Sequence, residues 1–316
     1  VEAKNRLTKT ESALRKQLTK IRVVSNGTTI IKSFEPISSV GCYVPGGLAR
    51  YPSSAIMSIV PAKLAGVQKI IMVTPPDKQG KIDPLVLVAA DTCGANMIFK
   101  VGGAHAIAAL AIGTKSIPLV DKIVGPGGSF VTTAKYLMTN TTSIDMLAGP
   151  TELVILADDS ANPRLVALDL VSQAEHSSDT KCILITTSQN LANKVALEVT
   201  KLFSVIPRKD IVQSSLQKNG FIAVGNVSDV ILLANKIAPE HIQILTKNPN
   251  KLASKIKTAG LILIGQNTPS AASDYLLGTN HILPTNRFGR SRGSLSVLDF
   301  VKIQTSVEAS KSALQK

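Results

Sequence analysis

The stretch NMIFKVGGAHAIAALAIG, residues 96–113, indicates the fold class because it predicts a strand joined to a helix through a glycine turn. Its apolar start predicts a buried strand, the Gly102–Gly103 pair predicts a tight turn, and the alanine-rich run after it predicts a helix. The stretch VDKIVGPGGSFVTTAKYLM, residues 120–138, has the same order of strand, turn and helix. Units of this kind are typical of an α/β fold with parallel sheets.

Apolar strand segments separated by helical segments continue along the chain. They are residues 69–76, 151–158, 181–188, 220–226, 241–247 and 261–266. Continuous rather than alternating apolar strands indicate mainly parallel sheets with both faces covered. A Gly-Pro turn in DMLAGPTEL, residues 145–153, predicts the break between two domains.

The bulk composition indicates a globular protein. The chain has 316 residues, 44% of them hydrophobic and 18% charged, which is enough for about two domains. No apolar run is long enough for a transmembrane helix, and the Lys-rich first twenty residues lack the apolar segment of a secretory signal, so we expect no membrane partner. Three widely spaced cysteines, Cys42, Cys93 and Cys182, are typical of reduced thiols in the cytoplasm.

The formal charge of +14 raises the possibility of nucleic-acid binding. However, only 3% of the residues are aromatic and Trp is absent, so there are few side chains on which bases could stack. The lysines are spread along the chain, and the densest basic stretch is NRFGRSRGS, residues 286–294. We therefore expect no nucleic-acid partner and interpret this stretch as a solvated loop or an anion contact.

The two glycine turns, VGGAHA and VGPGGSF, are candidates for a cofactor site. In doubly wound sheets such turns can hold a dinucleotide against a helix amino terminus. Neither turn is a complete G-x-G-x-x-G motif followed by an acid about twenty residues later. Tight structural turns without a ligand therefore remain the favoured alternative at this point.

The stretch LVSQAEHSS, residues 170–178, places two polar side chains at the end of an apolar helical stripe. Asn162-Pro163 predicts the helix start. The stripe then consists of Val166, Leu170, Gln173 and His176 or Ser177, at spacings of three and four. An imidazole and a carboxamide on one face can both reach one target, and imidazole is a common zinc ligand. Buried polar groups bonded to backbone are the alternative.

Glu240 and His241 form a second polar pair, at the entry to a predicted strand in IAPEHIQIL. A carboxyl and an imidazole side by side can serve as acid and base, although a surface turn is an equally good interpretation. Asp274 and His281, in ASDYLLGTNHILP, add two more residues that can bind a metal. Three of the four histidines of the chain lie in these stretches.

Taken together, these stretches resemble histidinol dehydrogenase, a zinc- and NAD-dependent family. The similarity covers about residues 38–300, and the motifs occur in family order. They are YVPGGLARYPSSAIMSIVPAKLAGV, VGGAHAIAALAIGT, DKIVGPGGSFVTTAK, DMLAGPTELVILAD, LVSQAEHSSD, APEHIQI, SDYLLGTNHILPT and LSVLDF. The resemblance implies oxidation of L-histidinol through L-histidinaldehyde to L-histidine, with hydride transfer to two NAD molecules, in a cytoplasmic homodimer.

The resemblance also implies roles for individual residues. Gln173, His176 and Asp274 match zinc ligands, and the zinc orients the substrate. His241 matches the general base, and Glu240 matches the group that activates water. The substrate-binding positions are Thr151, Gln173, His176, His241, Asp274 and His281, and the NAD-binding positions are Tyr43, His105 and Gly128.

Two Rossmann-like domains follow from the resemblance, one inserted in the other. We expect a discontinuous zinc and substrate domain from residues 1–43 and 153–300, an NAD-binding domain from residues 44–152, and the start of a C-terminal tail in residues 301–316.

The chain departs from the family pattern at three residues and is shortened at both ends relative to the family. His105 replaces a usual Gln, Gly128 a usual Asn, and Thr151 a usual Ser. The family has a longer N-terminal segment, and it continues past LSVLDF with a tail that carries a further His ligand for zinc and a substrate-binding Glu. The alternative interpretation is therefore an inactive or impaired chain of the same fold, a pseudoenzyme or fragment without the C-terminal ligands.

Overall fold

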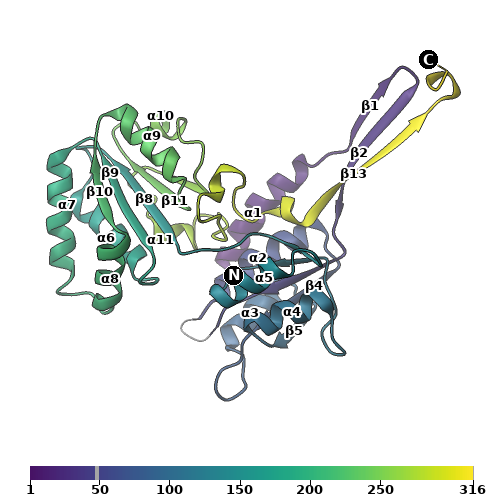
Figure 1. Cartoon of the computed structure of the whole chain (residues 1–316), viewed down its shortest axis with the longest axis horizontal. Coiled ribbons are helices and arrows are strands. Elements are labelled where there is room, and N and C mark those ends of the chain that lie inside the picture. The colour runs from purple at the N-terminus through teal and green to yellow at the C-terminus, as the bar shows by residue number, and fades with distance from the viewer. Residues whose placement is uncertain (47–49, 316) are drawn as a thin grey trace. The chain divides into compact units, whose positions relative to one another are not determined.

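The computed structural model describes residues 1–46 and 50–315, so part of the stretch YVPGGLARYP lies outside the described residues. The chain divides into two compact units (Figure 1). Unit 1 comprises Val1–Asp145, Gly278–Ile282 and Leu295–Lys316. Unit 2 comprises Met146–Leu277 and Leu283–Ser294. Unit 2 is thus inserted in unit 1, whereas the sequence predicted residues 44–152 as the inserted domain.

Unit 1 is built on a parallel sheet with the strand order β5-β4-β3-β6-β7. Its strands are β3 (Ser39–Tyr43), β4 (Lys69–Thr74), β5 (Met97–Lys100), β6 (Lys122–Val124) and β7 (Ser143–Ile144). Its helices are α1 (Glu2–Gln17), α2 (Pro52–Ala65), α3 (Pro84–Cys93), α4 (Gly103–Ile112) and α5 (Ser129–Leu137). Apolar residues of α4 and α5 pack on one face of this sheet, and α2 contacts its central strands from the other.

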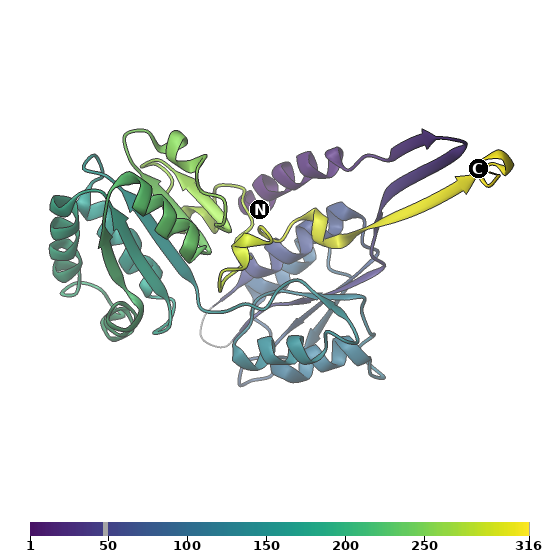
Figure 2. The ribbon, with the colours of Figure 1, turned by 45° about the horizontal axis from the view of Figure 1, so that its top comes forward.

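A second sheet of unit 1 is antiparallel and exposed. Its strands are β1 (Ile21–Ser25), β2 (Thr28–Pro36) and β13 (Val301–Ala309), in the order β1-β2-β13. Figure 2 shows these strands extending away from the α/β body of unit 1. Every residue of β1 and nearly every residue of β13 is exposed.

Unit 2 contains a parallel sheet with the order β10-β9-β8-β11-β12. Its strands are β8 (Glu152–Ala157), β9 (Lys181–Thr186), β10 (Phe221–Val224), β11 (His241–Leu245) and β12 (Leu261–Ile264). Its helices are α6 (Pro163–Ala174), α7 (Gln189–Leu202), α8 (Lys209–Asn219), α9 (Val227–Ile237), α10 (Pro249–Ala253) and α11 (Ser270–Ser273). Apolar residues of α6, α7 and α8 cover one face, and those of α9 and α10 cover the other.

The two parallel sheets have the same topology. In each, the first strand is central, the next two extend the sheet on one side, and the last two extend it on the other. This is a Rossmann-like order, in which ligands usually bind beyond the carboxyl ends of the strands where the order reverses. The predicted α/β fold with two Rossmann-like domains is confirmed. Within the described residues, no helix is long and apolar enough to cross a membrane.

The observed division differs from the predicted domain boundaries. Residues 1–43 group with residues 44–145 rather than with the second half of the chain. The reason is strand pairing, because β3 pairs with β4 and β6 in the sheet of unit 1. Residues 146–152 belong to unit 2, where Glu152 begins β8.

Candidate functional site

The amino ends of β8 and β11 bring two carboxyl groups and an imidazole together in unit 2. These strands are parallel neighbours, with His241 opposite Leu153. The backbone N–H of Glu152 donates a hydrogen bond of 3.0 Å to Glu240 Oε2. His241 Nδ1 lies 3.8 Å from the same oxygen, and both side chains are buried. The predicted pair is therefore a buried cluster and not a surface turn.

Burial raises the pKa of Glu240 well above the usual range of a carboxyl group. The N–H of Glu152 opposes this shift, whereas the carboxyl groups of Glu152 and Asp274 add to it. The charge of Glu152 is partly balanced by Lys181, whose Nζ lies 2.8 Å from Glu152 Oε1. A carboxyl group whose pKa is raised is a stronger base than an ordinary one and is suited to proton transfer.

Gln173 occupies the last turn of α6, where the predicted apolar stripe of Val166 and Leu170 ends. Its side chain is buried, and Gln173 Oε1 accepts a hydrogen bond of 3.2 Å from Ser270 Oγ in α11. Asp274 follows α11 directly, and burial raises the pKa of its carboxyl group to about 6. The packing of α11 on α6 therefore brings the elements that carry Gln173 and Asp274 together.

His176 does not continue the helical stripe as predicted, because α6 ends at Ala174. The His176 N–H instead donates to the carbonyl oxygen of Gln173 at 3.1 Å, which forms a tight turn beyond the helix. Desolvation lowers the pKa of the His176 imidazole and nearby Arg208 lowers it further, while Glu175 opposes them. Although His176 is exposed, its lowered pKa favours the neutral imidazole, which is the form that binds metals.

The donor set of Gln173, His176 and Asp274 fits zinc chemically, since it offers one imidazole nitrogen and two kinds of oxygen. The mutual repulsion of Glu240, Glu152 and Asp274 would also be relieved by a cation. Among residues 1–46 and 50–315, however, no group of three His, Cys, Asp or Glu side chains is arranged to hold a metal ion. The predicted trio contains two residues of those types.

The remaining substrate candidates lie in different units. Thr151 precedes β8 in unit 2, and its carbonyl oxygen accepts a hydrogen bond of 2.9 Å from the Lys181 N–H. It is therefore at the same sheet edge as Glu240 and His241. His281 belongs to the short segment Gly278–Ile282 of unit 1.

In unit 1, the glycine turn after β6 faces the end of β3, where the strand order reverses. The Tyr43 hydroxyl accepts a hydrogen bond of 3.1 Å from the Gly103 N–H at the start of α4. Gly125 has a φ of 111°, and a Cβ there would lie 2.1 Å from the carbonyl oxygen of Tyr43. Only glycine fits this position, so the backbone of the two strand ends stays in close approach.

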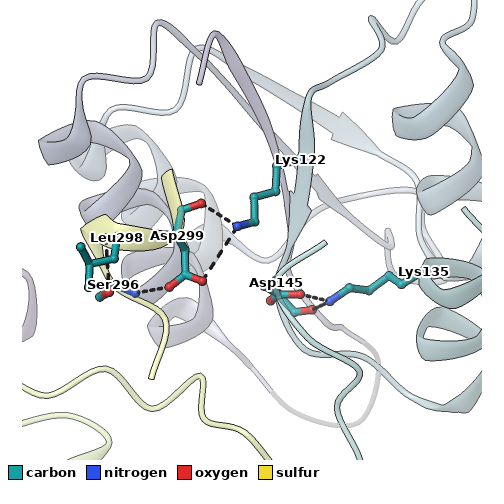
Figure 3. A network of polar contacts seen from close by, with 7 residues as sticks. Lys122, Lys135, Asp145, Ser296, Leu298 and Asp299 are labelled. Carbon is teal, nitrogen blue, oxygen red and sulfur yellow. Dashed lines mark hydrogen bonds and ion pairs between the residues drawn. The ribbon is translucent and has the colours of Figure 1, made fainter. Parts of the chain in front are cut away.

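A buried ion pair holds this turn. Lys135 Nζ of α5 bonds Asp145 Oδ1 and also donates to the Gly125 carbonyl oxygen at 3.0 Å (Figure 3). Asp145 Oδ2 accepts the Gly125 N–H at 2.8 Å. Figure 3 also shows Lys122 of β6 contacting Asp299, which caps the short helix Val297–Phe300. The ion pair therefore fixes both polar groups of the Gly125 backbone.

His105 and Gly128 occupy the amino ends of two helices. His105 lies in the first turn of α4 and is exposed. Gly128 is the N-cap of α5 in an extended conformation, and a Cβ added there would meet no atom within 4 Å. The backbone therefore does not require glycine at position 128, and a larger side chain would fit.

The sequence interpretation missed three buried charged residues: Glu152, Lys135 and Asp145. Glu152 lies in the stretch TELVILAD, where a charge at the start of an apolar strand was the available signal. Lys135 follows Val131 by four residues on the apolar face of α5, so a lysine at a core position was the signal there.

Comparisons with known proteins agree on one family. A family model described as histidinol dehydrogenase matches residues 1–316. The chain is 44% identical over 299 residues to a histidinol dehydrogenase from Methanocaldococcus jannaschii, covering 95% of this chain and 70% of that protein. It is 49% identical over 282 residues to a histidinol dehydrogenase from Lactiplantibacillus plantarum, covering 89% of this chain and 66% of that protein. The chain thus spans about two thirds of the length of these curated relatives.

A solved structure of the same family also matches this chain. A crystal structure of histidinol dehydrogenase from Elizabethkingia anophelis matches with a TM-score of 0.95 and 36% identity, covering 99% of this chain and 72% of that one. A crystal structure of an acetylating aldehyde dehydrogenase from Geobacillus thermoglucosidasius matches with a TM-score of 0.61 and 15% identity, covering 98% of this chain and 83% of that one. The second match shows a similar fold alone.

Proposed function

The chain belongs to the histidinol dehydrogenase family, and we propose that it catalyses the NAD-dependent, four-electron oxidation of L-histidinol through L-histidinaldehyde to L-histidine. The observation that carries this proposal is the buried group of Glu240 and His241 beside Glu152 at one sheet edge. The elements that carry Gln173 and Asp274 pack on each other in the same unit. The arrangement supports a site that combines proton transfer with substrate positioning.

In this proposal, Gln173, His176 and Asp274 would hold zinc, which would help to position the substrate when bound, and NAD would supply the acceptor for the two hydrides. His241 takes the proton of the alcohol as the first hydride leaves its carbon. His241 then releases that proton, and Glu240 accepts a proton from the water that adds to the aldehyde. His241 takes a proton of the resulting hydrate as the second hydride leaves its carbon. Thr151 and His281 contact the substrate.

The electrostatics of Glu240 support its role. A carboxyl group with an ordinary pKa is a weak base, whereas burial and the neighbouring carboxyl groups make Glu240 a stronger one. The same burial excludes bulk water from His241. Tyr43, His105 and Gly128 would contact NAD at the switch point of unit 1, where the Lys135–Asp145 pair keeps the glycine turn in place.

An inactive or impaired member of the family is the second candidate. It is favoured by Gly128, which offers no side chain at the amino end of α5 where the family usually has Asn. Cofactor binding weakened at this position would lower turnover without changing the fold.

A homodimer is supported by the antiparallel sheet of unit 1. Val23, Ile30 and Val307 lie opposite one another across its three strands and are 52%, 38% and 64% exposed. An apolar row on an exposed ribbon is typical of a surface that another chain covers. We propose that a second copy covers it, and that the protein acts in the cytoplasm, where the buried thiols of Cys42, Cys93 and Cys182 stay reduced.

The test is steady-state NADH formation from L-histidinol by the zinc-loaded, full-length protein. His241→Asn should lower kcat by at least about a hundredfold, the usual range for removing a general base, while zinc content stays unchanged. Glu240→Gln should release the aldehyde or slow the second oxidation. Lack of turnover by the wild-type protein, or full activity of His241→Asn, would contradict the proposal.

A further inference from the structure

The carboxyl edge of the unit 2 sheet carries a hollow that the proposed reaction does not use. Its volume is about 330 Å³, within the lower range of small-molecule sites. It is lined by Asp158, which follows β8, and by Thr246 and Lys247, which follow β11. The strand order of the sheet reverses between β8 and β11, and open α/β sheets bind ligands at this point.

The hollow is separate from the proposed catalytic groups. Glu240 and His241 lie at the amino end of β11, whereas Thr246 and Lys247 follow its last residue. The five residues of β11 separate the two ends by about 16 Å, at about 3.3 Å per residue. A ligand in the hollow would therefore bind away from the proposed catalytic groups, whether or not they carry out the proposed reaction.

One wall of the hollow is basic and another is apolar. Lys247, Lys251 and Lys255 line it at intervals of four residues. The apolar lining consists of Leu156, Ala157, Val227, Val230 and Leu252. Such a combination suits a ligand with an anionic group at one end and an apolar body at the other.

Asp158, the one carboxylate among the described lining residues, has its oxygens occupied. Asp158 Oδ2 accepts the Lys247 N–H at 3.0 Å, and Oδ1 accepts the N–H and hydroxyl of Ser160. These bonds tie the ends of β8 and β11 together and stabilise the charged form. The three lysines therefore exceed the single carboxylate, and the hollow has a net positive charge.

The lining of the hollow also contains a hydroxyl group that could donate a hydrogen bond. Thr246 Oγ1 is shielded from solvent and has no hydrogen-bond partner among the described residues. The amino end of α9, in contrast, is already capped by the Asn226 side chain, which accepts from Ser228 and Asp229. An anion in the hollow would thus be bound by lysines and a hydroxyl rather than by a helix end.

We propose that this hollow binds a small organic phosphate. The phosphoryl group lies against Lys247, Lys251 and Lys255 with Thr246 Oγ1 as an additional donor, and the apolar part contacts Val230 and Leu252. The turn after β8, DDSAN at residues 158–162, contains two aspartates and no glycine. It therefore lacks the glycine turn that cradles a pyrophosphate, which favours a monophosphate over a dinucleotide.

The test uses phenyl phosphate as the probe, because it has an aromatic ring and one phosphoryl group but none of the adenine of NAD. Titration of the full-length, isotope-labelled protein, followed by amide NMR, should give saturable shifts at residues 246–255 with a Kd below about 1 mM. Inorganic phosphate and phenol, each carrying half of the probe, should bind at least about tenfold more weakly.

Charge-reversal variants locate the site. Lys251→Glu should weaken phenyl phosphate binding by about tenfold or more. Lys218→Glu is the matched control, since Lys218 is exposed on α8 in the same unit and does not line the hollow. Equal loss in both variants would mean general attraction to a basic protein and would overturn the proposal. So would the absence of saturable shifts at residues 246–255, or inorganic phosphate binding as tightly as the probe.

Discussion

Removing the Lys135 ammonium group should destabilise unit 1 and weaken NAD binding together. Lys135 and Asp145 are 2% and 0% exposed, and the pair holds the Gly125 carbonyl oxygen and N–H. Lys135→Met keeps the length of the side chain but leaves the Asp145 carboxylate buried without its cation. Loss of one partner of a buried pair lowers the free energy of unfolding by about 3–5 kcal/mol, because the remaining charge stays desolvated.

The assay is urea unfolding of the single and double variants, followed by a probe placed in unit 1. Asp145→Asn should partly rescue Lys135→Met, since the amide oxygen of Asn can still accept the Gly125 N–H and no unpaired charge remains. The Kd for NAD should rise in Lys135→Met as the Gly125 turn loses one of its bonds. A loss of less than about 1 kcal/mol in the free energy of unfolding of Lys135→Met would contradict this expectation, and so would a double variant less stable than Lys135→Met.

Three further changes test other parts of the structure. Gly128→Asn should fold normally and lower the Kd for NAD, because a Cβ there meets no atom and the amide can contact ligand; an unchanged Kd by calorimetry would argue against a cofactor contact. Burial raises the pKa of Glu11 in the folded protein, so the wild-type protein should lose stability as pH rises above about 4.5 and the carboxyl group ionises. Glu11→Gln should therefore be more stable than wild type at pH about 7 and show little advantage near pH 4. Equal urea midpoints of the variant and the wild type at both pH values would contradict this. His176→Asn should remove most bound zinc from a folded protein, measured by metal analysis, and unchanged zinc content would exclude His176 as a ligand.

The fold class was predictable from the sequence because apolar strands and glycine turns are local signals. The domain boundaries were not, since β3 pairs with β4 and with β6, which follows about eighty residues after β3, and no local pattern encodes that partner choice. The insertion of one domain in the other came from the family resemblance rather than from spacing.

The candidate site was predictable in part. The spacing of Val166, Leu170 and Gln173 correctly predicted one buried helical face. The end of that helix was missed, because QAEHSS contains neither the Gly nor the Pro that usually marks a helix terminus. The pairing of Lys135 with Asp145 depends on how α5 packs against the sheet, so only the structure reveals it.

The most direct test of the proposed reaction is the stoichiometry of a complete turnover. With limiting L-histidinol, excess NAD and added zinc, the protein should form two NADH for each L-histidine produced, because His241 and Glu240 serve both oxidations in one site. One NADH with accumulated aldehyde, or no NADH at all, would contradict a four-electron oxidation by this chain.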